Sequence, residues 1–129
     1  MQSAERMIID HIGIPVSDFE ASKIFYAKVL ASLDYELIME VEGAAGFGAH
    51  GGRPRFWIGR GEKSKGPLHV AFRAENREKV RKFYEAALAA GGIDNGPPGL
   101  REIYHPNYYG AFVSDPDGHN IEAVCHDPE

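Results

Sequence analysis

Apolar and polar residues alternate with two different periods in the first half of the chain. Over residues 7–16 the apolar residues Ile12, Ile14 and Val16 alternate with other positions, which include His11 and Gly13. This segment is therefore predicted to be a strand with one apolar face. From residue 19 to 33 the apolar positions recur every three or four residues, which predicts a helix whose buried stripe consists of Phe19, Ser22, Phe25, Tyr26, Val29, Leu30 and Leu33. Three shorter strands are predicted over 35–41, 45–50 and 55–59, between glycine-rich turns.

The same pattern begins again 58 positions further along the chain. Residues 69–72 align without a gap on residues 11–14, and at that offset Glu78 matches Glu20, Phe83-Tyr84 matches Phe25-Tyr26 and Leu88-Ala89 matches Leu30-Ala31. This many matches in one gapless run indicates an internal duplication. After the second helix, the pattern predicts a stop at residues 91–92, a strand near Ile93, a loop over residues 97–99 and a final hairpin formed by 108–114 and 119–125.

Each copy therefore has the order strand, helix, three strands. One such unit has one sheet and one helix to cover it, so two units are expected to share a core. We predict an α+β fold in which two tandem βαβββ modules, about 7–60 and 67–125, form one domain over residues 1–129. Their mixed sheets are expected to curl around a shared concave cavity.

The final hairpin contains a carboxylate on a strand that is otherwise apolar. Asp115-Pro116-Asp117-Gly118 is typical of a tight turn, because proline suits its second position and glycine the left-handed position that ends it. A turn at this place pairs Asp115 with His119 and Phe112 with Glu122, and it directs Glu122 toward the cavity. A buried carboxylate is costly unless it is paired or binds a metal.

Two histidines are expected on the same concave face as Glu122. Alternation places His11 opposite the apolar face of the first strand, and the repeat places His69 at the equivalent position. A single histidine in a strand is more often a hydrogen-bonded structural residue than a metal ligand. Two equivalent histidines facing one glutamate favour a metal site, with open positions for substrate. We predict one divalent ion per site, which could be Fe, Mn, Ni, Co or Zn.

Other residues are candidates for catalysis or substrate binding. The near-neutral pKa of a histidine and the hydroxyl of a tyrosine suit proton transfer, which makes His105 and Tyr108 candidate catalytic residues. The cavity wall is predicted to include His50, Phe56, Trp57, Tyr104 and Phe112. For any one of these aromatic residues core packing is an alternative, and for His105 a surface loop is. His119 and His126 are expected to be solvated.

Composition excludes several classes of protein. The net charge of −5 argues against nucleic acid as a partner, because phosphate binding requires a basic face. Cys125 is the only cysteine, and no apolar run has the length of a signal peptide or a membrane span, so we expect a cytoplasmic domain that does not bind membranes. Residues 46–51 match Gly-x-Gly-x-x-Gly, but glycine, arginine and proline follow, so the helix that a dinucleotide site needs is missing.

The paired modules, the segment from Asp10 to Gly13, its counterpart over residues 69–72 and the closing Asp-Pro-Asp-Gly-x-x-Ile-Glu motif resemble the vicinal oxygen chelate superfamily. That superfamily includes glyoxalase I, extradiol dioxygenases, methylmalonyl-CoA epimerase, fosfomycin-modifying thiol transferases and bleomycin-binding proteins. The resemblance covers residues 7–125 and implies a metal held by His11, His69 and Glu122.

Two departures from the family pattern narrow the reaction. Glyoxalase I enzymes carry a glutamate that is both ligand and base on the last strand of the first half, where this chain has residues 55–58, Arg-Phe-Trp-Ile. Extradiol dioxygenases carry a tyrosine where this chain has Phe112, although Tyr108 lies on the same predicted face. A thiol transferase would need a pocket for a thiol peptide, and the sequence reveals none.

The sequence thus predicts a divalent-metal-dependent enzyme that acts on a small substrate with vicinal oxygens, by lyase, isomerase or ring-cleaving dioxygenase chemistry. The alternative is a metal-free protein of the bleomycin-resistance type that sequesters a small molecule. A homodimer is expected. The short, glycine-bearing linker over residues 60–66 permits the ligands to come from one chain or from two.

Overall fold

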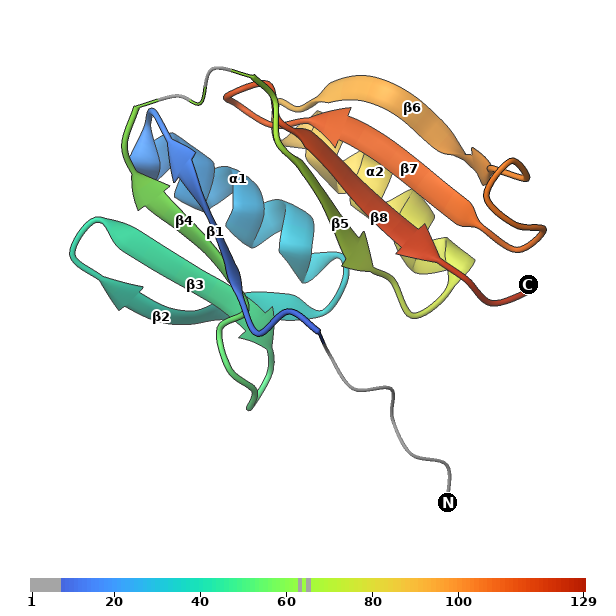
Figure 1. Ribbon diagram of the computed structural model, residues 1–129, viewed down its shortest axis with the longest axis horizontal. Helices are drawn as coiled ribbons and strands as arrows, with labels where there is room; N and C mark the ends of the chain where they lie inside the picture. The colour runs from blue at the N-terminus through green and yellow to red at the C-terminus, as the bar shows by residue number, and fades with distance from the viewer. Residues whose placement is uncertain (1–7, 63, 65) are drawn as a thin grey trace.

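The computed structural model describes residues 8–62, 64 and 66–129, and it contains two copies of one βαβββ module (Figure 1). The first module consists of β1 (Ile12–Val16), α1 (Phe19–Ala31), β2 (Tyr35–Val41), β3 (Ala44–Ala49) and β4 (Phe56–Arg60). The second consists of β5 (His69–Arg73), α2 (Arg77–Ala89), β6 (Ile93–Leu100), β7 (Tyr109–Ser114) and β8 (Asn120–Cys125). The predicted α+β duplication is confirmed.

Each module forms one mixed sheet with the same topology. The strand orders are β1-β4-β3-β2 and β5-β8-β7-β6, and in each sheet only the first pair is parallel. Parallel strands need a long connection that usually contains a helix, and α1 and α2 each follow the first strand of their module. This topology brings the predicted metal ligands of the second module together, because β5 and β8 are direct neighbours.

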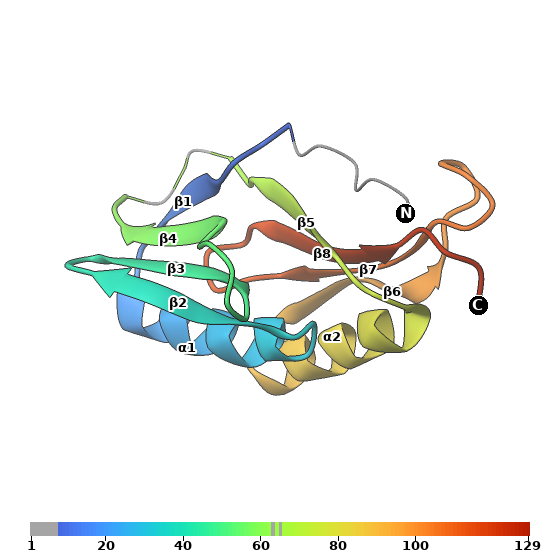
Figure 2. The ribbon, with the colours of Figure 1, turned by 90° about the horizontal axis from the view of Figure 1, so that it is seen from below.

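Both helices cover the same side of the two sheets, and the other side of each sheet is left open (Figure 2). The residues of the predicted α1 stripe are all buried, and Asp18 caps the helix by accepting a hydrogen bond from the Ala21 amide at 3.1 Å. The core continues from one module into the other, since the rings of Phe56 and Phe72 meet edge to face with centroids 5.0 Å apart. The two modules therefore share one core.

A polar contact also joins the modules at the final hairpin. Asp115, which is 5% exposed, accepts a hydrogen bond from the Tyr26 hydroxyl on α1. Asp117 accepts two more from Ser17, at 3.1 Å from its amide and 2.5 Å from its hydroxyl. Burial, followed by the charge of Asp115, raises the pKa of Tyr26 well above its ordinary value, so this phenol remains a donor. The turn thus anchors the start of α1 as well as ordering its own strands.

The register of this hairpin is the predicted one. Phe112 lies opposite Glu122, the Asp115 amide donates to the His119 carbonyl at 3.1 Å, and Gly118 has a φ of 83°. A residue with a side chain would be strained at that angle. The turn therefore fixes which face of β8 carries Glu122.

Several predicted boundaries are wrong. The first strand begins at Ile12 and not at residue 7, because its partner β4 begins opposite Ile12 at Phe56; Met7 itself lies outside the described residues. The first helix ends at Ala31, two residues early. Residues 97–99, predicted as a loop, lie within β6. Proline is tolerated there because β6 is an edge strand and its register with β7 shifts on both sides of Gly96.

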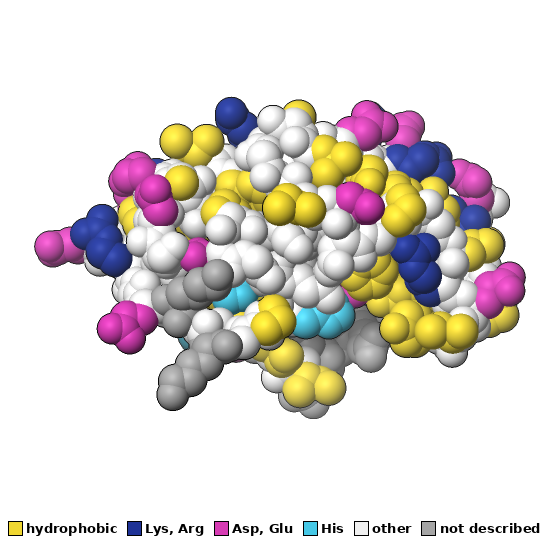
Figure 3. Space-filling view, turned by 90° about the horizontal axis from the view of Figure 1, so that it is seen from above, with side chains coloured by type: hydrophobic (Ala, Val, Ile, Leu, Met, Phe, Trp, Pro, Cys, Tyr) yellow, Lys and Arg dark blue, Asp and Glu magenta, His cyan; other side chains and the backbone are white. Residues whose placement is uncertain are grey.

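Neither helix in the described part of the chain is long and apolar enough to cross a membrane. On the face that Figure 3 shows, Lys and Arg side chains are dispersed among hydrophobic and acidic ones.

Candidate functional site

Glu122 is a buried carboxylate with two side-chain partners. It is 1% exposed on β8, and its Oε1 lies 2.8 Å from Nε2 of His69 on the neighbouring β5. Its Oε2 accepts a hydrogen bond from the Tyr108 hydroxyl. Both carboxylate oxygens are thus engaged, which offsets the cost of removing the group from water. Alternation predicted that His69 and Glu122 share a face, and the structure brings them together.

Tyr108 lies one residue before β7 and donates a hydrogen bond to Oε2 of Glu122, the oxygen that His69 does not contact. Burial, and then its hydrogen bond with Glu122, raises the pKa of Tyr108. The hydroxyl therefore stays protonated near neutral pH and donates to the carboxylate. Its ring stacks at a tilt on Tyr104, with centroids 4.7 Å apart. Tyr104 is 61% exposed, so it supports Tyr108 from the solvent side.

His105 lies beside Tyr108, with centroids 5.6 Å apart, but both of its ring nitrogens are occupied. Nδ1 accepts from the Asn107 amide at 3.1 Å, so the neutral ring carries its proton on Nε2. Nε2 lies 2.9 Å from Nδ1 of His126, which makes His105 the donor in that pair. The sequence predicted that His126 would be solvated. Its side chain is exposed, yet it packs against His105 and Tyr108.

His11 precedes β1 in the other module, and its side chain is 60% exposed. Its Nδ1 lies 2.8 Å from Oδ1 of Asp10. The hydrogen bond with His11 is the main cause that lowers the pKa of Asp10, so this carboxylate is ionised and can only accept. In the neutral ring of His11 the proton therefore resides on Nδ1, and the lone pair is on Nε2. A carboxylate that orients an imidazole in this way is the usual second shell of a metal-binding histidine.

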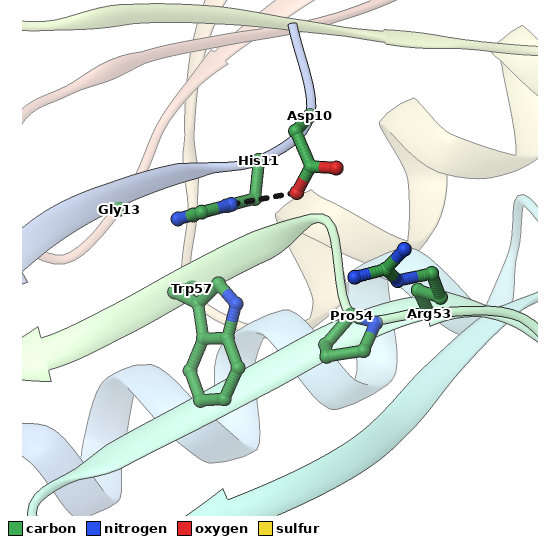
Figure 4. Close-up of a pocket in the computed structure, with 6 residues that line it drawn as sticks. All are labelled: Asp10, His11, Gly13, Arg53, Pro54 and Trp57. Carbon is green, nitrogen blue, oxygen red and sulfur yellow. Dashed lines mark hydrogen bonds and ion pairs between the residues drawn. The ribbon is translucent and has the colours of Figure 1, made fainter.

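Two cavities contain His11. One, of about 490 Å³, is lined by Asp10, His11, Gly13, Arg53, Pro54 and Trp57 (Figure 4). The other, of about 690 Å³, extends between the modules and is bordered by both predicted histidine ligands, His11 and His69. It is largely apolar inside, with Phe47, Phe56 and Phe72 among its lining residues. The modules therefore enclose shared space, as the fold prediction required.

The predicted metal ligands lie as a pair in the second module and a single histidine in the first. His69 and Glu122 present a nitrogen and an oxygen 2.8 Å apart, which is close to the spacing of neighbouring ligands around an ion bound at about 2.1 Å to each. His11 adds an oriented imidazole from the other module. Within residues 8–62, 64 and 66–129, no three His, Cys, Asp or Glu side chains are grouped closely enough to hold an ion together.

The other predicted wall residues have different surroundings. Trp57 lines the smaller cavity, and Phe112 lies beside His69 with ring centroids 6.3 Å apart. Phe56 is 4% exposed and borders the larger cavity from within the core. His50 lies outside both cavities. Its side chain is 91% exposed, and its Nδ1 is 2.9 Å from Oε1 of Glu36.

The prediction that His119 is solvated is wrong. This side chain is 1% exposed, and its Nδ1 accepts a hydrogen bond from the Leu68 amide at 3.1 Å. The signal was present in the sequence, because the alternation that turns Glu122 to the cavity puts His119 on the same face as Ile121, toward the core. His119 therefore ties the hairpin to the segment before β5.

A family model described as the Glyoxalase/Bleomycin resistance protein/Dioxygenase superfamily matches residues 8–123. No match is found among curated proteins.

Solved structures of the same kind are similar over most of the chain. A glyoxalase/bleomycin resistance protein from Albidiferax ferrireducens is 25% identical, with a TM-score of 0.77, and the match covers 94% of this chain and 100% of that one. A family enzyme from Burkholderia phytofirmans is 19% identical, with a TM-score of 0.72 and coverage of 92% and 98%. A mutant of the fosfomycin resistance protein FosX from Listeria monocytogenes, complexed with Mn(II) and 1S,2S-dihydroxypropylphosphonic acid, is 21% identical, with a TM-score of 0.67 and coverage of 96% and 90%. The chain thus belongs to the glyoxalase/bleomycin resistance protein/dioxygenase superfamily.

Proposed function

We propose that this protein is a divalent-metal-dependent enzyme that acts on a small substrate with two neighbouring oxygens. The observation that carries the proposal is the buried carboxylate of Glu122, 1% exposed and 2.8 Å from Nε2 of His69. Nε2 of a histidine and Oε1 of a glutamate are both metal-ligating atoms, and here they face each other from neighbouring strands. The proposed ligands are His69, Glu122 and His11.

The residues around these ligands would prepare them for the ion. Asp10 keeps the proton of His11 on Nδ1 and leaves Nε2 available. Tyr108 orients Glu122 through Oε2 and leaves Oε1 facing His69. When bound, a divalent ion supplies a Lewis acid that polarises two substrate oxygens and stabilises an oxyanion or enediolate. Lyase, isomerase and dioxygenase reactions all use this chemistry.

Proton transfer is assigned to Tyr108 and His105. The Tyr108 hydroxyl is the donor nearest the proposed ligands, because it already contacts Glu122. His105 lies on the solvent side of Tyr108 and is linked to His126 by a hydrogen bond of 2.9 Å, so the pair can exchange a proton with water. His50, which was predicted to be part of the cavity wall, lies outside both cavities and has no part in this proposal.

Metal analysis of the purified protein tests the proposal. The unaltered protein, loaded separately with Fe, Mn, Co, Ni and Zn and then desalted, is expected to retain about one ion per site. The double variant His11→Ala, His69→Ala is expected to retain none, whereas His50→Ala, which removes an exposed histidine, retains as much as the unaltered protein. Equal metal content in the double variant and the unaltered protein would refute the proposal.

A homodimer is part of the proposal. Leu37, Met39 and Val41 on the edge strand β2 are 40–50% exposed, and a row of exposed apolar residues on an edge strand favours association. A dimer can combine His11 of one copy with His69 and Glu122 of the other, or each chain can supply all three ligands.

Mixing two inactive variants distinguishes these arrangements. If the ligands come from two chains, a mixture of His11→Ala and Glu122→Gln, exchanged through mild denaturant and refolded, recovers metal binding in a fraction of its sites, because some pairs carry one intact site. If each chain supplies its own ligands, the mixture binds no more metal than either variant alone. Light scattering on the same samples measures the oligomeric state.

A second candidate function is metal-free binding of a small molecule. The apolar cavity of about 690 Å³ between the modules supports it, since cavities of this size and character accommodate small ligands. Calorimetric titration of a ligand with and without chelator separates the two functions. Tight binding that chelator leaves unchanged would favour sequestration over metal-dependent catalysis.

A further inference from the structure

The smaller cavity has a flat aromatic wall that is held in place from behind. The indole of Trp57 lies over Gly46 of β3, where a Cβ would be only 2.8 and 2.9 Å from two ring carbons of the indole. The same Cβ would be 2.7 Å from Pro54, so proline and indole both pack on the bare backbone. One face of the ring is therefore fixed against the sheet. The other lines the cavity.

The floor beside the indole is open. Gly13 of β1 lies opposite Trp57 in the parallel register, and it contributes no side chain to the cavity. A Cβ at Gly13 would meet Trp57 at an ordinary contact distance of 3.6 Å, so the space is available and not filled by a neighbour. Figure 4 shows His11 and Trp57 on facing sides of this hollow and Arg53 at its rim. A planar group can stack on the indole there.

The charges around the hollow favour an anion, although the chain carries a net charge of −5. Of the residues that line the hollow, Arg53 carries a positive charge and Asp10 a negative one, and Arg55, outside the lining, offsets the charge of Asp10. The guanidinium of Arg55 donates to the backbone carbonyl of Asp10 at 3.0 Å and lies 3.6 Å from the carboxylate of Asp10. Arg53 forms no ion pair with any residue in the described part of the chain.

The acid whose pKa the charge of Arg53 lowers is Asp10, and its carboxylate is already engaged. Its Oδ1 lies 2.8 Å from Nδ1 of His11, and its Oδ2 lies 3.6 Å from Arg55. The Arg53 guanidinium lies at the rim of the hollow, and its planar donors match a carboxylate.

We propose that this hollow recognises planar aromatic carboxylates, with the ring on Trp57 and the carboxylate at Arg53. This inference rests on the proposed function, because it directs the oxygens of such a substrate toward the free Nε2 of His11.

Trp57 is the only tryptophan of the chain, so its fluorescence reports on this hollow alone. Benzoate, titrated in the presence of EDTA with excitation at the red edge of indole absorption, is expected to quench it saturably. Benzamide lacks the negative charge, and cyclohexanecarboxylate lacks the planar ring. Each is expected to bind at least about tenfold more weakly than benzoate.

Arg53→Gln is expected to bind benzoate no better than benzamide, while its affinity for benzamide stays unchanged. Lys82→Gln alters the net charge equally from an exposed site on α2 and keeps the preference for benzoate. Circular dichroism checks that both variants are folded. Equal binding of benzoate and benzamide by the unaltered protein, or an undiminished preference in Arg53→Gln, would overturn the inference.

Metal content measured on the same samples separates this inference from the proposed function. A protein that retains metal through its three ligands but does not prefer benzoate refutes only the carboxylate site. A protein that prefers benzoate but retains no metal refutes only the metal-dependent function.

Discussion

Replacing Glu122 by glutamine is expected to lower the affinity for divalent metal by about 100-fold or more, a larger loss than second-shell substitutions cause. The amide keeps the size of the side chain and an oxygen for the Tyr108 hydroxyl, so the fold is retained. It removes the negative charge of Glu122, which the pair of Glu122 and His69 would use to bind a cation. Competition with a chromogenic chelator measures the change.

Tyr108→Phe is the matched control for this prediction. It removes only the hydrogen bond that orients Glu122, so its affinity is expected to fall by about 10- to 100-fold, the range found for second-shell partners. If glutamine at position 122 bound metal as tightly as the unaltered protein, Glu122 would not be a ligand.

Asp115→Ala is expected to destabilise the protein by about 3 kcal/mol, because it leaves three buried donors without an acceptor. Asp115 accepts from the Asp117 and His119 amides, at 2.9 and 2.8 Å, and from the Tyr26 hydroxyl. Urea unfolding followed by circular dichroism gives the free energy.

Tyr26→Phe separates the two parts of this network. It removes the contact between the modules and keeps the turn, so a loss of about 1–2 kcal/mol is expected. A loss in Tyr26→Phe equal to that in Asp115→Ala would mean that the turn hydrogen bonds contribute nothing.

The fold could be predicted from the sequence because local and repeated signals agree. The helical stripe from Phe19 to Leu33 is buried, and the duplication gives both sheets one topology. The Pro116 and Gly118 turn fixes the hairpin register, and alternation turns Glu122 to the face that His69 shares. Each of these inferences needs only alternation and turn chemistry, which depend on neighbouring residues.

The remaining features depend on contacts between distant segments. The hydrogen bond from His105 to His126 joins a loop to the C-terminal tail, and no local pattern specifies it. The pairing of Tyr26 with Asp115 likewise requires knowing how the modules dock. The start of β1 at Ile12 is set by where β4 begins, which is a property of the partner strand. The place of Arg53 at the rim of the hollow depends on the contacts of Asp10 with His11 and Arg55, which no local pattern in the sequence specifies.

Pulsed electron paramagnetic resonance of the protein loaded with Cu(II) or Mn(II) tests the central claim most directly, because it detects the nitrogens of imidazoles bound to the ion. We expect two coordinated imidazoles in the unaltered protein, one in His11→Ala and one in His69→Ala, with His50→Ala unchanged. A spectrum without coordinated imidazole, or one that neither the His11 nor the His69 substitution alters, would contradict a metal site formed by His11, His69 and Glu122.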